Sequence, residues 1–221
     1  MVAASILPVT IHKGKLYFLF GKENEMEDSS SGFSDFGGGV EQGESIMETA
    51  LREGSEELCG FLGDSEAIKK LLKSGGVYTL VVDSYNIHIF FMEYDPKLPC
   101  YFTNHHRFLW ERMDKDVLND SKYFEKQEIR WFSVDDMRSD ISLFRDFYQN
   151  MVSKILNETK EITTFIKQNK RRGAICSLST PFRIADAESD TSFPFITARN
   201  VEVLNEKTRK TRKTRKRNKG G

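Results

Sequence analysis

The chain has 221 residues, of which 38% are hydrophobic and 30% are charged. This length and balance fit one globular domain with room for a tail. Three cysteines without a CxxC pair exclude a disulfide framework and the usual zinc-ribbon spacing. No apolar run approaches the roughly 18 residues of a membrane span, and the first residues lack the pattern of a signal peptide. We therefore expect an intracellular protein, cytoplasmic or nuclear, that contacts no membrane.

The net charge of zero hides an uneven distribution. Residues 207–221 hold nine lysines and arginines and no acidic residue, which leaves 24 basic against 33 acidic residues in 1–206, a formal charge of −9. A block of like charge stays solvated, so we expect 207–221 to be a disordered basic tail. Such a tail attracts phosphate polymers such as RNA. A targeting signal or a solubilising tail is the alternative interpretation.

The first half of the chain combines short strands with one strongly amphipathic helix. Runs of β-branched and aromatic residues predict strands at 6–11, 16–20, 34–36, 77–82 and 87–94. The segment 12–15 reads as a glycine-containing hairpin turn, and three glycines follow the third strand. Helical periodicity and end signals predict helices at 44–58 and 62–74. Polar or proline-containing stretches predict loops at 22–31 and 95–100.

The second half is expected to be more helical. Its patterns predict helices at 108–118 and 143–168, a strand at 128–132 and a short helical turn at 134–137. Periodicity is lost after about residue 170. We therefore predict a folded domain over 1–170, an extension over 171–206 that either docks on the domain or stays loose, and the tail.

The segment 37–60, GGGVEQGESIMETALREGSEELCG, holds the most informative pattern in the chain. On an ideal helix, Glu53, Glu56 and Glu57 lie within roughly 100° of one another, beside the apolar arc. Carboxylates at this spacing repel, and only Arg52 lies close enough along the helix to offset them. Oxygen ligands of this kind suit a hard divalent cation, Mg²⁺ or Mn²⁺. Taken without their context, three such glutamates are more typical of a solvated acidic face.

The spacing from Gly38 to Gly60 resembles the Nudix box, G-x5-E-x7-R-E-U-x-E-E-x-G-U, in which U is apolar. The opening glycine and five polar or charged positions match it: Gly38, Glu44, Arg52, Glu53, Glu56 and Glu57. The order strand, loop, helix around the box matches as well, and the resemblance extends loosely over 1–168. It implies the α/β fold class, as a Nudix-like α/β/α sandwich with a mixed β-sheet and the Nudix loop–helix.

Two positions depart from the box. Gly54 stands where the family has an apolar residue, which should cost about 1 kcal/mol of helix propensity and leave packing unfilled. Cys59 stands where the family has its glycine, and Gly60 follows one place later. We therefore expect the helix to end one residue later than in the family. Neither departure touches a carboxylate.

The resemblance also implies an activity, a cofactor and residue roles. Nudix enzymes are Mg²⁺- or Mn²⁺-dependent hydrolases that cleave a diphosphate bond in a nucleoside diphosphate linked to another group. By position, Glu53, Glu56, Glu57 and the backbone carbonyl of Gly37 would hold the metal. Arg52 and Glu44 match a pair that orients these carboxylates, with Arg52 reaching back through its long side chain.

The general base varies within the family. Glu53 is the preferred residue for this role, and Glu128 is the candidate from a later part of the chain. A surface ion pair is the alternative interpretation of Glu128.

Three functions remain open from the sequence. The first is hydrolysis of a small nucleotide derivative. The second is removal of the 5′ cap from mRNA, as similar domains do in eukaryotes and large DNA viruses, and the basic tail favours it. The third is a non-catalytic RNA- or protein-binding module, against which the intact box argues.

The remaining candidates lie in one aromatic segment. Tyr101, Phe102 and Trp110 are either a stacking wall for a base or ordinary core residues. We expect His105 and His106 to pack or to cap a helix rather than to bind metal.

Overall fold

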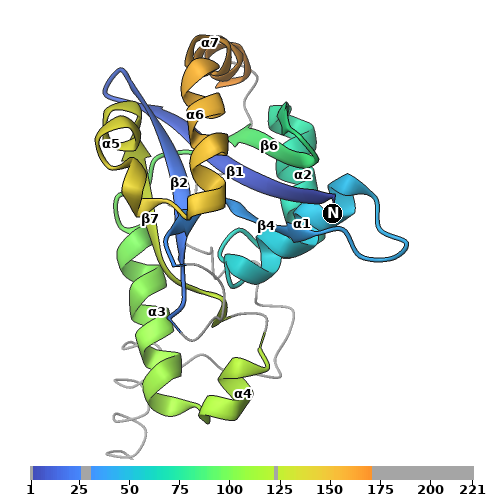
Figure 1. Cartoon of the computed structure of the whole chain (residues 1–221), viewed down its shortest axis with the longest axis vertical. Helices are drawn as coiled ribbons and strands as arrows, with labels where there is room; N and C mark the ends of the chain where they lie inside the picture. The colour runs from blue at the N-terminus through green and yellow to red at the C-terminus, as the bar shows by residue number, and fades with distance from the viewer. Residues whose placement is uncertain (1, 26–30, 122–123, 171–221) are drawn as a thin grey trace, which may run out of the picture. The chain divides into compact units, whose positions relative to one another are not determined.

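The computed structural model describes residues 2–25, 31–121 and 124–170 (Figure 1). The predicted extension at 171–206 and the predicted basic tail at 207–221 lie outside the described residues. None of the helices in the described ranges is long and apolar enough to cross a membrane.

A seven-stranded mixed sheet forms the centre of the described part. Its strands are β1 (Ala3–His12), β2 (Lys15–Glu23), β3 (Phe33–Ser34), β4 (Phe36–Gly39), β5 (Tyr78–Val82), β6 (Tyr85–Phe91) and β7 (Lys126–Ser133). The main strand order is β3-β2-β1-β6-β5, with β4 paired to β1 and β7 paired to β2. β1 and β6 run parallel, and the other pairs are antiparallel.

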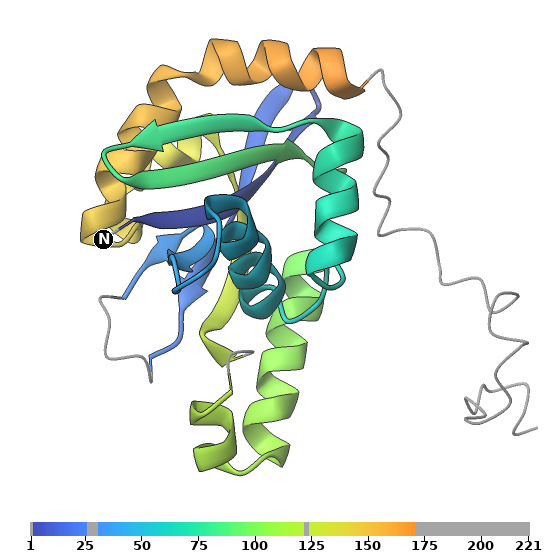
Figure 2. The ribbon, with the colours of Figure 1, turned by 90° about the vertical axis from the view of Figure 1, so that its right-hand side faces the viewer.

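Helices cover both faces of the sheet, which confirms the expected α/β/α arrangement. One core lies under α1 (Ile46–Glu57), α2 (Ser65–Gly75) and α3 (Leu98–Arg112). The other core lies under α5 (Val134–Ser139), α6 (Gln149–Asn157) and α7 (Thr159–Lys170). Figure 1 shows α6 crossing β1 and β2, and Figure 2 shows β1, β5 and β6 between α7 and α1. Strand β1 contributes side chains to both cores, because alternate side chains of a strand point to opposite faces of the sheet.

The hairpin between β1 and β2 is confirmed. Lys13 and Gly14 both have positive φ, 48° and 80°, and His12 pairs with Lys15. Two successive left-handed residues form a type I′ turn, whose twist suits a two-residue hairpin.

The region after β6 differs from the sequence prediction. The segment 95–100 is only partly a loop, since α3 already begins at Leu98 with Pro99 in its first turn. Proline is tolerated there because the first backbone N–H groups of a helix have no partner within it. The predicted helix at 108–118 is in fact the end of α3 and the separate helix α4 (Lys115–Asn119). Asp114 separates them, since its side chain accepts hydrogen bonds from the first backbone N–H groups of α4.

The long helix predicted at 143–168 is also interrupted. Short 3₁₀ turns at Ile141–Leu143 and Asp146–Tyr148 precede α6, and Glu158 separates α6 from α7. Phe147, in the second of these turns, is 48% exposed. Apolar spacing alone did not reveal these breaks, because buried residues continue on either side of them.

Helix α1 is shorter than predicted and better packed. Ser45 and Glu48 form a capping box at its start, and the helix ends at Glu57. Cys59 adopts a left-handed φ of 50° directly after the helix. The expectation that the shifted glycine, Gly60, would end the helix one residue later was therefore wrong. At Gly54 no packing is left unfilled, because a Cβ there would lie 2.6 Å from Cγ1 of the buried Ile6. Ile6 fills the space that a larger residue would need.

Candidate active site

Arg52 forms the centre of a charged group on the half-exposed side of α1. Its Nε lies 2.7 Å from Oε1 of Glu44, and its Nη2 lies 3.1 Å from Oε2 of the same carboxylate. This fork-to-carboxylate pairing fixes both side chains in one geometry. The arginine therefore reaches back to the residue just before the helix, as the sequence predicted.

Two carboxylates of α1 converge on one nitrogen of the same arginine. Nη1 of Arg52 lies 2.8 Å from Oε1 of Glu53 and 3.2 Å from Oε2 of Glu56. Two carboxylate oxygens thus lie within reach of a single positive atom. Such a pair suits a hard divalent cation as well as it suits a guanidinium nitrogen. We call Arg52, Glu44, Glu53 and Glu56 the Arg52 cluster.

The glycine strand β4 lies directly against this helix. A Cβ on Gly38 would lie 2.7 Å from the carboxyl carbon of Glu53, so a larger residue there would displace this carboxylate. The backbone N–H of Gly37 donates a 2.8 Å hydrogen bond to Oε2 of Glu57. The structure therefore places the backbone of Gly37 beside α1.

Glu57 lies in different surroundings from the other two glutamates. Its side chain is only 4% exposed, and its Oε1 lies 3.0 Å from Nζ of Lys126 on β7. The expectation that only Arg52 offsets the carboxylates was therefore wrong. Lys126 comes from a distant part of the chain, and no local spacing rule places it near the helix.

Lys126 is the centre of a second, buried charged group. With 1% of its side chain exposed, its ammonium contacts Glu57, Glu23 and the hydroxyl of Ser34, and Glu23 also pairs with Arg145. Buried charges persist only when they are paired in this way. We call Lys126, Glu57, Glu23 and Arg145 the Lys126 cluster.

The pKa values in the Lys126 cluster reflect its burial. Burial raises the pKa of Glu57 well above its usual value, although the nearby Lys126 acts in the opposite direction. Burial also acts to lower the pKa of Lys126, but the carboxylates of Glu57 and Glu23 outweigh it, and the pKa is raised. The lysine therefore stays positively charged.

A buried carboxylate also supports the glycine strand. Asp35, between β3 and β4, accepts hydrogen bonds from the hydroxyls of Ser5 and Tyr85. Burial raises its pKa above the usual value. These bonds tie the start of β4 to β1 and β6, and so hold Gly37 at its place beside α1.

The carboxylates that converge most closely belong to the Arg52 cluster. The described residues contain no group of three or more side chains already arranged to hold a metal ion. Glu53 and Glu56 nonetheless fit such an ion, because their oxygens converge on one positive atom. Glu57 has Lys126 and the N–H of Gly37 as its partners in this arrangement.

Glu128 lies in another part of the site. It lines an open cleft of about 520 Å³ between α3 and the paired ends of β2 and β7, together with His106 and Trp110 of α3. Phe102 is buried in the core, whereas Tyr101 is 53% exposed. His105 packs on Phe61 and His106 on Phe124, which confirms the expected packing of both rings.

Comparisons with known proteins gave matches among solved structures only. No protein-family model and no curated protein sequence matches the chain. The crystal structure of a C. elegans Ap4A hydrolase binary complex is 16% identical, with a TM-score of 0.40, and the match covers 73% of this chain and 96% of that one. A NUDIX hydrolase from Nitrosomonas europaea is 17% identical, with a TM-score of 0.34 and coverage of 72% and 91%.

A third similar structure is the NUDIX domain of Shewanella oneidensis NrtR complexed with ADP ribose. It is 13% identical, with a TM-score of 0.41, and the match covers 74% of this chain and 88% of that one. Likenesses this weak carry no argument about what this chain binds or does.

Proposed function

We propose that this chain is a Nudix-type hydrolase that cleaves a diphosphate bond in a nucleoside diphosphate linked to another group. The observation that carries the proposal is the convergence of Glu53 and Glu56 on one cationic nitrogen, 2.8 and 3.2 Å away. Glu44 holds that arginine from the other side. These residues also match the spacing of the Nudix box, and a solvated acidic face does not require that spacing.

The metal would be Mg²⁺ or Mn²⁺, held by Glu53 and Glu56 together with Glu57 and the carbonyl of Gly37. When bound, such an ion neutralises charge on the diphosphate. Arg52 keeps the carboxylates close together, and the glycine strand leaves room for phosphate beside them. Glu53 is our preferred acceptor of the proton from the attacking water.

The direct test is hydrolysis by Glu56→Gln across a panel of nucleoside diphosphate derivatives in Mg²⁺. A carboxamide keeps the shape but cannot hold a dication, so we expect the rate to fall by at least about a hundredfold. Glu66→Gln, on the exposed surface of α2, is the matched control and should retain the wild-type rate. An active Glu56→Gln variant would refute the metal assignment. A wild type that hydrolyses nothing would favour the non-catalytic binding module.

The basic tail favours a substrate with a long anionic chain, such as capped mRNA. The acidic remainder, at −9, repels RNA, whereas the nine cations of 207–221 attract it. Truncation before Lys207 should therefore abolish RNA binding and slow the turnover of capped RNA but not of a cap dinucleotide. RNA binding that ignores both salt and truncation would instead favour a small nucleotide substrate.

A further inference from the structure

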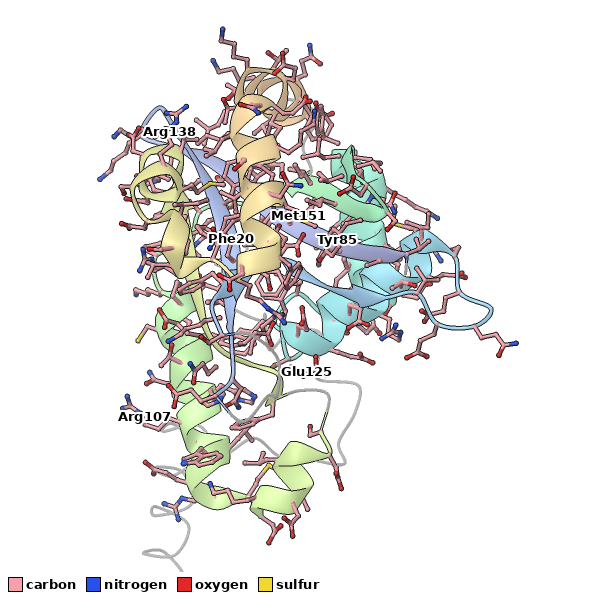
Figure 3. The ribbon with its side chains drawn as sticks, in the orientation of Figure 1. Phe20, Tyr85, Arg107, Glu125, Arg138 and Met151 are labelled. Atoms are coloured by element: carbon pink, nitrogen blue, oxygen red, sulfur yellow. The ribbon has the colours of Figure 1, made fainter. Side chains whose placement is uncertain are left out.

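One face of α3 forms a wall of the open cleft. Thr103, His106, Arg107 and Trp110 line it, and their spacing of three, four and seven residues places them on one side of a helix. Arg107 is labelled on α3 in Figure 3. The cleft is therefore built on a regular element, not on a chance gap between loops.

A β-bulge forms the opposite wall. Lys22 pairs with Glu128 and Glu23 with Lys126, so Gln127 is an extra residue on β7. Neighbouring strand residues normally point to opposite faces, yet Gln127 and Glu128 both line the cleft. The bulge explains this, because it re-aims side chains, and bulges are common beside functional sites. It also lets Lys126 turn inward.

The aromatic side of the cleft is ordered by stacking. The rings of His106 and Phe124 lie 4.1 Å apart with an angle of 11°, and those of Trp110 and Phe124 lie 5.9 Å apart with an angle of 6°. Lys115 covers one face of the Trp110 ring, 3.3 Å from its centroid. Trp110 is still 40% exposed, so a ligand can meet its remaining surface.

Asn24 holds the cleft in one arrangement. Its amide nitrogen donates to the carbonyl of Phe124 at 2.9 Å, which fixes the orientation of the amide. The same nitrogen lies 3.2 Å from Nε2 of His106, which therefore accepts. Burial, and then the neighbouring His105, lower the pKa of His106, so its ring is neutral at pH 7. A neutral ring suits a neutral aromatic ligand.

Two residues that line the cleft adjoin the charged groups of the candidate active site in sequence. Asn24 follows Glu23, and Gln127 follows Lys126, and both of these neighbours belong to the Lys126 cluster that pairs with Glu57. Glu125, labelled below α1 in Figure 3, is close enough for its charge to raise the pKa of Glu57. The Lys126 cluster therefore connects the cleft with the carboxylates of α1.

We propose that this cleft binds the heterocyclic base of the substrate nucleotide. Trp110 and His106 provide a flat apolar wall, and Gln127 and Glu128 provide hydrogen-bonding groups for the polar edge of a base. Glu128 is thereby assigned to recognition of N–H donors on the base, not to proton transfer from water. The proposal rests on the proposed function, since it takes the diphosphate to lie at the Arg52 cluster.

The test is calorimetric titration of the full chain with adenosine and guanosine 5′-monophosphate in EDTA, so that no hydrolysis enters the readout. We expect saturable binding that Trp110→Ala weakens about tenfold or more, because an aromatic platform contributes that much per base. Trp110→Phe keeps an aromatic ring at this position and should retain most of the affinity. This result would show that Trp110→Ala weakens binding by removing the ring and not by disturbing the fold. Phe108→Ala is the matched control, because Phe108 is 61% exposed on the same helix and does not line the cleft.

Three results would overturn the proposal: absent binding by the wild type, unchanged binding in Trp110→Ala, or equal losses of affinity in Trp110→Ala and Phe108→Ala. Trp110-dependent binding without hydrolysis would leave the cleft assignment standing and refute the proposed function. For Glu128→Gln we expect an altered preference among bases and a raised KM. A loss confined to kcat would return Glu128 to the role of general base.

Discussion

Helix α1 contributes to two charged groups that differ in burial. In the Arg52 cluster, Arg52, Glu44 and Glu56 have 21–22% of their side chains exposed and Glu53 has 13%. In the Lys126 cluster, Lys126, Glu57 and Glu23 are between 1 and 6% exposed, and Arg145 is 15% exposed. Adjacent residues, Glu56 and Glu57, belong to different clusters.

This contrast shows how one helix can serve two purposes. The Arg52 cluster is partly exposed, so separating one of its pairs costs less than separating a pair in the interior. The Lys126 cluster has less freedom, since a buried charge without a partner is strongly destabilising. The buried cluster therefore anchors α1 to the sheet, and Glu57 would keep Lys126 as a partner while its carboxylate holds the metal.

The largest expected effect comes from removing the buried cation. Lys126→Met leaves Glu57 and Glu23 with one partner fewer in the interior, so the free energy of unfolding should fall by about 3–5 kcal/mol. Urea denaturation measures this change. The double variant Lys126→Met with Glu57→Gln should be less destabilised than the sum of the single variants, because it removes both members of the pair.

The control for this prediction is Lys15→Met. Lys15 pairs with Asp135 on an exposed surface at a similar distance, 3.1 Å, and its loss should cause no measurable change. Equal effects of Lys15→Met and Lys126→Met would remove the distinction between the clusters.

Gly54→Ala tests the contact between α1 and Ile6 of β1, because α1 carries residues of both clusters. The new methyl group would overlap Ile6, so α1 must move away from β1. Overpacking costs about 1–3 kcal/mol and outweighs the gain of about 1 kcal/mol in helix propensity. We expect a net loss of about 1–2 kcal/mol in thermal or urea unfolding, partly restored when Ile6→Val is added. A stabilised Gly54→Ala variant would show that the helix has room there.

The smallest expected effect is a dependence on pH within the Arg52 cluster. Hydrogen bonds from Arg52 and Thr49 lower the pKa of Glu44 from 4.5 to about 2. Because the folded-state pKa is the lower one, the ionised carboxylate stabilises the fold above pH 4.5, and this contribution is lost as the pH falls towards 2. The difference in stability between wild type and Glu44→Gln should therefore vanish near pH 2. A difference independent of pH would contradict the pairing.

The Arg52 cluster and the Lys126 cluster also differ in how far the sequence predicts them. The Arg52 cluster lies within one loop and one helix, so helical spacing placed its glutamates on one side of the helix, and the resemblance to the Nudix box implied the pairing of Arg52 with Glu44. Lys126 is separated from Glu23 by 103 positions, and only the pairing of β2 with β7 brings them into contact. A lysine near the start of a strand gives no local signal of burial.

Element types were easier to predict than their ends. The hairpin at Lys13 and Gly14 and the helix after Ser45 carry strong local signals, namely a turn glycine and a capping box. The break at Glu158 has no such signal, and Pro99 suggested a loop where it begins a helix. The cleft could not be foreseen, because α3, β2 and a bulge in β7 build it jointly.

Calorimetric titration with Mn²⁺ tests whether the Arg52 cluster holds a divalent cation. The wild type should bind the ion, and Glu56→Gln should bind it about tenfold or more weakly, since one converging carboxylate is lost. Glu66→Gln should match the wild type, because its carboxylate lies on the exposed surface of α2. Equal affinities in all three proteins, or no binding by the wild type, would refute a metal site at the Arg52 cluster.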